Sequence, residues 1–577
     1  MPHTDPSTHR SPAPAPGPGP DGRVPDRGAA PDPGARLTAP GAPFAVVTTE
    51  DGRRVYADGP RTLREFVEVT WAYGERPFLV ADSRTYTYGE FFAAACALAR
   101  RFTDVYGLRP GDRAVVAMRN HPEWQVAFWA AQLAGLVAVP LNAWWTEDEF
   151  TYALDDCRPR VLLVDGERVE RVRDWARRHR VAALVFHGEA EEGFERYEDL
   201  PAADPALGPP DVEVRPEDDA TIVYTSGTTG RPKGAVATHL AQAGAAANPR
   251  FHAAAAALER GEIPGQGPAP VSLTTFPFFH VAAFTSFYAV MAAGGTLVLM
   301  HRWDAAKALE LIHRHGVTHY AGVPTTALQL LDAAGDGGLG SLAHLNTGGA
   351  AAPPGIVARC PRGVEPRNGY GLTETCGGVL AAFGASYRRF PGSVGRPTPV
   401  TEVRIAAPDG RALPEGEVGE LWLRGQSLVR GYWEDPEATA AAFTSDGWFR
   451  TGDLATVHDG RVSVVDRLKD MVIRGGENVY CGEVEAALYD HPDVLDAAVL
   501  GVPHPQLGEE VAAVVRLREG AAAGAEELRA HVARSLAAFK VPAHVLVQDG
   551  PLPRNATGKV LKRDLRPAVE ARVRAAS

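Results

Sequence analysis

Strand-like and helix-like patterns alternate through the first half of this 577-residue chain. Four short runs are rich in apolar and β-branched residues: FLVAD (78–82), RAVVAM (113–118), RVLLVD (160–165) and VAALVF (181–186). Helical patterns stand between them, over residues 88–102 and 121–135, and Thr146 with Glu149 forms a capping-box pattern that predicts a further helix start. Short apolar runs of this kind are typical of buried strands. The alternation therefore predicts an α/β fold with a mainly parallel sheet.

The pattern changes after about residue 400. Shorter strand patterns, EVRIAA, GELWLRG and GRVSVVDR, predict a β-rich subdomain, and the last hundred residues read as a small α+β unit. The charged segment DRLKD (466–470) is the expected boundary, because linkers are exposed and polar. We therefore predict a large N-terminal domain of parallel sheets flanked by helices over 43–468 and a small C-terminal domain over 469–577.

Two segments need separate interpretations. Residues 1–42 are rich in Pro, Ala, Gly and Asp and are predicted to be a disordered tail. Residues 281–300 carry no charged side chain and are long enough to span a bilayer, but they contain polar residues and the break Gly294-Gly295. We predict a buried helix, a turn and a buried strand there, and no membrane span.

Composition excludes some classes of function. The net charge is −12, which argues against a nucleic-acid partner, so an anionic ligand must be held by local donors. The five cysteines are scattered without a C-x-x-C pair, which predicts reduced thiols and a cytoplasmic protein.

The stretch YTSGTTGRPKG (224–234) combines three glycines, several hydroxyls and Lys233 directly after a strand pattern. Glycines let backbone amides approach a ligand closely, and hydroxyls and lysine bind oxyanions. No Walker A frame fits this stretch. The composition indicates a phosphate-binding loop of another kind.

Four further segments follow in order: RNGYGLTET (367–375), WFRTGD (448–453), DRLKDMVIRGGENVY (466–480) and PLPRNATGKV (551–560). Together with the glycine-rich loop they closely resemble the adenylate-forming superfamily, which includes acyl-CoA synthetases and coumarate-type CoA ligases. The resemblance covers nearly all of residues 45–570. It implies a large domain with a small C-terminal lid, and a two-step reaction. A carboxylic acid attacks ATP to give acyl-AMP, and a thiol such as that of CoA then takes the acyl group.

The resemblance assigns residues to the nucleotide. The loop around the β- and γ-phosphates comprises Thr225, Ser226, Gly227, Thr228, Thr229, Gly230 and Lys233. Glu374, with Thr225, matches the magnesium site, since a carboxylate suits a hard cation. The positions around adenine and the α-phosphate are Gly349, Ala350, Ala351, Asn368, Gly369, Tyr370, Gly371 and Thr373. Asp453 matches the ribose-binding carboxylate, and Arg467 a ribose or phosphate contact.

In the lid, Lys559 matches the lysine that bridges the carboxylate and the α-phosphate during adenylation. Lys469 falls at the family's hinge. Rotation about it is implied to remove Lys559 and to bring in the loop of Arg474, Gly475 and Gly476, past which the pantetheine arm runs.

The acid pocket is implied to involve His280, Phe284, Gly322, Gly349, Gly371 and Gly377. The segments around it contain no Asp for an amino group and no Lys or Arg for a second carboxylate, which disfavours an amino acid. We expect a medium- or long-chain fatty acid, with an aromatic acid as the alternative. An enzyme that loads an acyl carrier protein and a non-catalytic binding relative also remain open.

Overall fold

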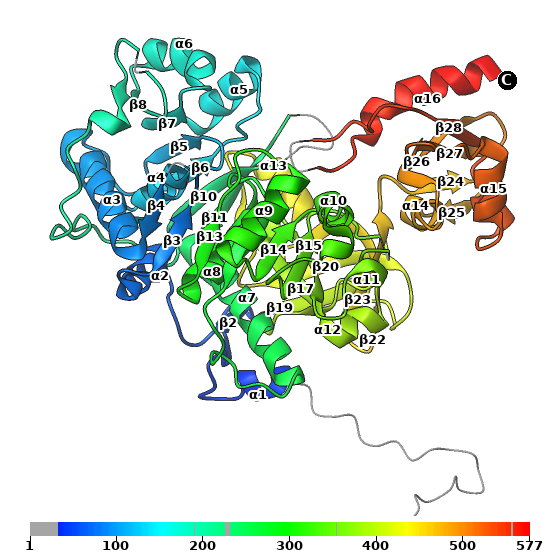
Figure 1. Cartoon of the computed structure of the whole chain (residues 1–577), viewed down its shortest axis with the longest axis horizontal. Helices are drawn as coiled ribbons and strands as arrows, with labels where there is room; N and C mark the ends of the chain where they lie inside the picture. Colours follow the sequence, from blue (N-terminus) through cyan, green and yellow to red (C-terminus); the bar gives the residue numbers. More distant parts are fainter. Residues whose placement is uncertain are drawn as a thin grey trace, which may run out of the picture.

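The computed structural model describes residues 33–576 except positions 83, 190, 226–230, 354 and 556–557. Figure 1 shows a large body, coloured blue to yellow, and a smaller C-terminal part in orange and red. The red segment before the last helix runs back from the small part toward the large body.

One sheet of the large body has eight strands. Their spatial order is β21 (Gly431–Tyr432), β11 (Gly234–Thr238), β10 (Asp219–Tyr224), β6 (Val137–Pro140), β5 (Arg113–Ala117), β7 (Val161–Asp165), β8 (Ala182–Phe186) and β9 (Glu195–Arg196). Every pair from β10 to β9 is parallel, whereas β11 and β21 are antiparallel additions. The parallel sheet predicted from the alternating patterns is confirmed.

The second large sheet has nine strands. Their order is β18 (Arg396–Pro397), β17 (Gly377–Phe383), β16 (Glu365–Leu372), β15 (His344–Gly348), β14 (His319–Gly322), β12 (Val271–Thr274), β13 (Thr296–Val298), β3 (Pro77–Val80) and β4 (Thr85–Thr87). The strands from β16 to β3 are parallel, and the outer ones are antiparallel. Carboxyl ends of parallel strands gather at one edge, where α/β proteins bind ligands.

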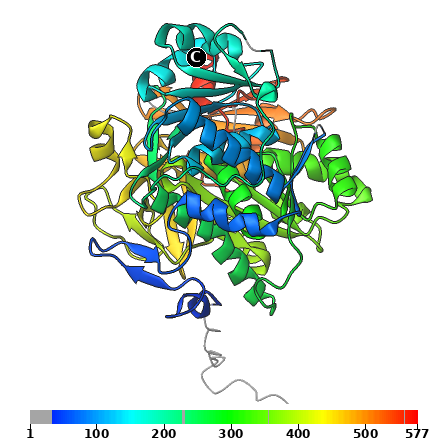
Figure 2. The ribbon, with the colours of Figure 1, turned by 90° about the vertical axis from the view of Figure 1, so that its left-hand side faces the viewer.

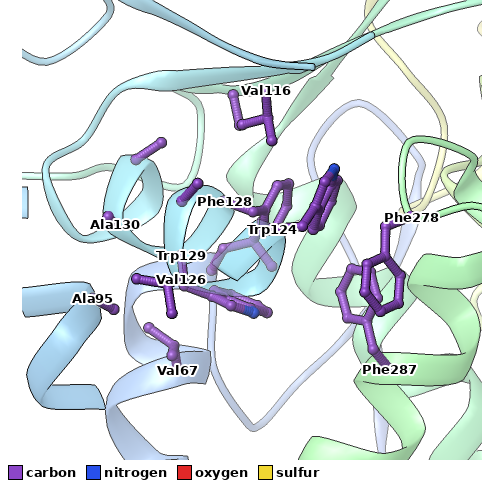
Figure 3. Packing of buried hydrophobic residues seen from close by; sticks show 14 of the residues in the cluster. Val67, Ala95, Val116, Trp124, Val126, Phe128, Trp129, Ala130, Phe278 and Phe287 are labelled. Atoms are coloured by element: carbon purple, nitrogen blue, oxygen red, sulfur yellow. The ribbon is translucent and has the colours of Figure 1, made fainter. Parts of the chain in front are cut away.

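Helices between the two sheets share a single apolar core. They are α2 (Leu63–Thr70), α3 (Tyr88–Arg100), α4 (Pro122–Leu133), α7 (His239–Glu259) and α8 (Val281–Ala292). All residues of α4 are buried. Figure 3 shows Trp124, Phe128 and Trp129 of α4 beside Phe278 and Phe287, with the ring centroids of Trp124 and Phe278 5.2 Å apart. This packing fixes α8 against the rest of the large body.

Other helices cover the outer faces of the two sheets. They are α5 (Glu147–Cys157), α6 (Val169–His179), α9 (Ala305–His315) and α10 (Pro324–Ala334), with the short α11 (Gly355–Arg359), α12 (Gly384–Arg389) and α13 (Pro436–Ala442). The capping box predicted at the start of α5 is present, since Glu149 N–H donates to Thr146 Oγ1 and Thr146 N–H donates to Glu149 Oε2.

The uncharged segment 281–300 forms α8, a glycine turn and β13, as its sequence predicts. Within the described residues, no helix combines the length and apolar character that crossing a bilayer requires. All five cysteines are buried with free thiols.

A four-stranded antiparallel sheet leads into the small C-terminal part. It comprises β19 (Thr401–Ala406), β20 (Gly419–Gly425), β22 (Phe449–His458) and β23 (Arg461–Arg467). The small part contains β24 (Val472–Arg474), β25 (Glu477–Val479), β26 (Val494–His504), β27 (Gly508–Leu517), β28 (His544–Val547), α14 (Cys481–Tyr489), α15 (Ala525–Ala533) and α16 (Lys562–Ala576). Its own apolar core lies between β26, β27 and α14. Lys469 stands in the turn between β23 and β24.

The N-terminal region departs from the prediction. Residues 33–42, expected to belong to a disordered tail, contain α1 (Pro33–Thr38), and a hairpin of β1 (Val46–Thr48) and β2 (Arg54–Tyr56) follows. Leu37 and Phe44 are buried against Phe251 of α7, so even this Pro- and Gly-rich stretch finds apolar partners. Figures 1 and 2 both show α1 and the hairpin at one end of the molecule, beside α7. Residues 1–32 lie outside the described residues.

Candidate active site

The glycine-rich stretch begins at the end of β10 and ends at the start of β11, and these two strands are antiparallel neighbours. Thr225 N–H donates to the Lys233 carbonyl at 2.9 Å, which closes the base of the loop. The Nζ atom of Lys233 lies 5.3 Å from the ring centroid of Tyr432, on the neighbouring strand β21. The predicted phosphate-binding residues Ser226, Gly227, Thr228, Thr229 and Gly230 lie outside the described residues.

Glu374 lies in a single helical turn, Thr373–Thr375, directly after β16. The hydroxyl of Tyr432 donates to Glu374 Oε1 at 2.7 Å. Burial raises the pKa of Glu374, and the Tyr432 hydrogen bond opposes that rise only in part. A desolvated carboxylate gains from a cation, so Glu374 fits the chemistry of a magnesium ligand. Sequence reasoning missed Tyr432, because no motif joins it to a residue 58 positions earlier.

Asp453 and Arg467 face each other across β22 and β23. The Nε atom of Arg467 is 3.3 Å from Asp453 Oδ1, and the hydroxyl of Tyr370 donates to Asp453 Oδ2 at 2.6 Å. Asp453 is only 3% exposed, and Thr451 Oγ1 accepts its backbone N–H at 3.1 Å. Three predicted nucleotide residues are thus joined in one network, which fixes a carboxylate at the edge of the site.

The predicted adenine-pocket residues lie on adjacent strand ends. Gly349, Ala350 and Ala351 follow β15, and Asn368, Gly369 and Gly371 belong to β16. Gly349 has a φ of +75°, which favours glycine. At Gly371 a Cβ atom would stand 1.9 Å from the Gly377 carbonyl, so only glycine fits between β16 and β17.

Lys559 lies on the loop before α16 and belongs to the small domain. Its backbone N–H donates to Asn555 Oδ1 at 2.9 Å. A Cβ atom on the preceding Gly558 would stand 3.1 Å from Val323 of the large body, so this loop contacts it closely. Burial and then the charge of Arg467 lower the pKa of Lys559 to about 7, with Asp453 acting against them. The structure therefore brings Lys559 to the Asp453 and Arg467 network.

Arg474, Gly475 and Gly476 occupy a different place. They form the turn of the β24–β25 hairpin. Arg474 pairs with Glu510 of β27, with Nε 2.5 Å from Oε1, and Gly475 N–H donates to the Leu507 carbonyl. In this arrangement the contacts of the hairpin lie within the small domain, and the structure does not bring it together with Lys559.

A cavity of about 1680 Å³ lies between α7, α8 and strands β14 to β17; its lining includes Tyr370 of this site and extends to the exposed residues Arg260 and Glu262. Four of the residues predicted for the acid pocket, His280, Gly349, Gly371 and Gly377, line it. His280 caps α8 by accepting Ala282 N–H, and burial lowers its pKa to about 4, so the imidazole is neutral near pH 7.

Two of the predicted pocket residues do not line the cavity. Phe284 is fully buried on the other side of α8, where it packs against Phe128. Gly322 is enclosed by Thr275 and Tyr320. The cavity lining also includes Arg367 of β16, which lies outside the segments predicted to form the acid pocket.

Comparisons with known proteins agree with this arrangement. The mixed α/β fold with a large N-terminal and a small C-terminal domain is that of solved adenylate-forming enzymes. The chain belongs to the AMP-binding enzyme family, whose profile matches residues 67–433, and the family's C-terminal domain profile matches residues 483–559. It falls within the acyl-CoA synthetase branch of the adenylate-forming superfamily.

Individual relatives show the range of this branch. A feruloyl-CoA synthase from Amycolatopsis is 39% identical over 485 residues, covering 83% of this chain and 93% of the relative. The long-chain fatty acid–CoA ligase FadD13 of Mycobacterium tuberculosis is 33% identical over 502 residues, covering 84% and 93%. The o-succinylbenzoate CoA synthetase of Bacillus subtilis, solved with its acyl-adenylate intermediate, has a TM-score of 0.72 at 30% identity, covering 87% and 97%.

Proposed function

We propose that this chain activates an extended, largely apolar carboxylic acid with ATP and transfers the acyl group to CoA. The observation that carries the proposal is the convergence of Glu374, Asp453, Arg467 and Lys559 at one end of a long cavity floored by glycines. Charged groups stand where the nucleotide would lie, and small residues stand where the acid would enter.

The first half-reaction must bring two anions together, the carboxylate and the triphosphate. Cations that screen both groups lower this barrier. In our proposal Lys559 lies between the carboxylate and the α-phosphate, Arg467 contributes a second positive charge, and Asp453 accepts hydrogen bonds from the ribose hydroxyls. Magnesium, held by Glu374 with Thr225, supplies charge neutralisation on the phosphates when bound.

The second half-reaction needs a thiol to reach the acyl adenylate. We propose CoA as the acceptor, because relatives across the branch carry names of CoA ligases. Lys469 lies in the turn that joins the two domains and is suited to act as the hinge about which the small domain turns. We also propose a cytoplasmic location, which the scattered cysteines predict.

For the acid, we propose a medium- or long-chain fatty acid, which the volume of the cavity accommodates. An aromatic acid is the second candidate, favoured by the 39% identity to a feruloyl-CoA synthase. Both fit the volume of the cavity, in whose lining Gly349 has no atom nearer than 3.8 Å to where its Cβ would stand, which leaves room for a chain or a flat ring.

A mass-spectrometric screen tests this function. The purified protein receives Mg-ATP and a pool of fatty and aryl acids, with or without CoA, and Glu374→Gln serves as the impaired variant. We expect an acyl-CoA that requires both ATP and CoA. Acyl-AMP that accumulates despite CoA would favour a carrier protein as acceptor. Absence of both products across the pool would contradict the proposal.

A further inference from the structure

Tyr432 lies between two charged groups that the proposed function places at the phosphates of ATP. Its hydroxyl donates to Glu374 Oε1 at 2.7 Å, and the Nζ atom of Lys233 lies 5.3 Å from the centroid of its ring. The two contacts use different parts of one side chain, because the hydroxyl meets the carboxylate and the ring meets the ammonium. A single tyrosine therefore contacts both the expected magnesium ligand and the lysine that ends the glycine-rich stretch.

The backbone of Tyr432 is fixed on two sides. On one side, β21 pairs with β11, the strand that begins directly after Lys233, and Trp433 N–H donates to the Gly234 carbonyl at 2.7 Å. On the other side, Tyr432 N–H donates to Thr439 Oγ1 of α13 at 2.9 Å. The tyrosine therefore has a defined position relative to the strand that follows the glycine-rich stretch.

The same segment also holds the main chain of Glu374. Val429 N–H donates to the Glu374 carbonyl at 2.9 Å, three residues before the tyrosine whose hydroxyl meets the carboxylate. Glu374 itself lies in a helical turn of only three residues, Thr373–Thr375. Segment 429–433 thus connects β11 to both the backbone and the side chain of Glu374.

Both contacts of the tyrosine suit a site that binds a cation and phosphates together. A hydrogen bond to one oxygen of a carboxylate restricts its rotation and presents the other oxygen in one direction, and loss of such a partner typically costs about 10–100-fold in metal affinity. An ammonium is attracted to the face of an aromatic ring. Because a lysine side chain loses much rotamer freedom when it is ordered, a ring that already holds it lowers the entropic cost of binding a phosphate.

We propose that Tyr432 is a positioning residue of the nucleotide site: its hydroxyl orients Glu374 toward magnesium, and its ring holds Lys233 beside the phosphates. In this role it acts through these two residues and not on the reacting atoms. The inference rests on the proposed function. It adds to the ATP site a residue that lies outside all five motifs of the sequence.

Nucleotide binding without turnover tests the inference on the intact protein. Calorimetry measures the Kd for α,β-methylene-ATP, which lacks the bond that adenylation would break, in EDTA and in Mg²⁺. The ratio of the two constants gives the strengthening of binding by the metal. Tyr432→Phe should reduce this ratio about tenfold, since Glu374 loses its partner. The Kd in EDTA should stay within about twofold, because phenylalanine keeps the ring that contacts Lys233.

A second variant separates the ring from the hydroxyl. Tyr432→Leu removes both, so it should also weaken binding in EDTA by about two- to fivefold, as expected for one lost cation–π contact. The matched control is Tyr106→Phe, because the Tyr106 hydroxyl also donates to a glutamate, Glu195 Oε2, at 2.9 Å. Glu195 belongs to β9, at the edge of the eight-stranded sheet opposite β21. Tyr106→Phe should leave both constants unchanged.

The outcomes separate the inference from the proposed function. An unchanged metal ratio in Tyr432→Phe would overturn the inference, and so would equal weakening in EDTA and in Mg²⁺, which would reveal a structural role only. If Glu374→Gln kept the full metal ratio, Glu374 itself would be removed as the magnesium ligand. Failure of the unaltered protein to bind the analogue would instead contradict the ATP-dependent function.

Discussion

Two loops of the small domain have opposite relations to the large body. The loop with Lys559 contacts Val323 and brings a buried amine to the Asp453 and Arg467 network. The β24–β25 hairpin with Arg474 is tied within the small domain by Glu510. In the proposed function this arrangement is the one for adenylation, and a second arrangement is expected to bring the hairpin to the acyl group. One small domain would then serve the two half-reactions by turn.

The largest expected effect is the loss of acyl-AMP formation in a variant of the Lys559 loop. Lys559→Ala should lower acyl-AMP formation by about 10²–10³-fold, as does loss of a preorganised group that stabilises transition-state charge. Thioester formation from supplied acyl-AMP should change less than threefold, because the lysine would lie away from the site in that step. Pyrophosphate exchange and thioester release measure the two halves. Arg563→Ala, an exposed cation on α16, is the control. Equal loss of both halves would contradict the division of labour between the loops.

The second-largest expected effect is on the KM for ATP and comes from Asp453, in the network beside Lys559. Asp453→Asn should raise the KM for ATP about 10- to 100-fold, since hydrogen bonds to a charged group contribute roughly 1.5–3 kcal/mol. Initial rates over a range of ATP concentrations provide the measurement. The matched control is Asp459→Asn, an exposed carboxylate in the turn between β22 and β23, which should leave that KM unchanged. An unaltered KM in Asp453→Asn would remove this residue from the nucleotide site.

The pH dependence sharpens the comparison further. The pKa of Lys559 is lowered to about 7 by burial and by Arg467, so the free enzyme carries the ammonium below that pH and loses it above. The kcat/KM for adenylation should fall about tenfold per unit as pH rises beyond this pKa. The same measurement with Lys559→Arg, whose guanidinium stays charged, should show no such fall. A fall that persists in Lys559→Arg would assign it to another group.

The smallest effect concerns the hairpin. Glu510→Gln removes the charged partner of Arg474, in a pair whose carboxylate is buried and whose arginine side chain is 27% exposed. Thioester formation should slow about two- to fivefold, because the hairpin is held less firmly, while adenylation stays unchanged. Glu519→Gln, on the exposed turn after β27, is the control. A slower adenylation step in Glu510→Gln would show that the hairpin also acts in the first half.

The sequence predicts the regular parts of this molecule because their signals are local. Alternating apolar patterns locate β3, β5, β7 and β8, and the Thr146 and Glu149 pattern locates the start of α5. The three-residue strands β24 and β25 carry too few residues for a period-2 pattern, so only a glycine turn was expected there. Residues 33–42 were misjudged because Leu37 is stabilised by Phe251, more than two hundred positions away.

In the candidate site, too, residues that belong to local motifs could be predicted, whereas contacts that depend on strand pairing could not. Its motif residues can be predicted individually, and the structure joins Tyr370, Asp453 and Arg467 in one network. The contact between Tyr432 and Glu374 depends on β21 joining the sheet beside β11, which no short pattern reveals. The register of β15 and β16 sets which of their side chains lie side by side in the cavity lining. Arg367 could therefore be assigned to this lining only once the two strands were aligned.

The histidines His252 and His319 of the cavity lining differ from Lys559 in how they respond to pH. Burial holds the pKa of His252 near 4 and that of His319 near 3, far below the range in which Lys559 gains and loses its proton. A change of pH around neutrality is therefore expected to change the charge of Lys559, and with it the adenylation rate, while these cavity histidines stay neutral.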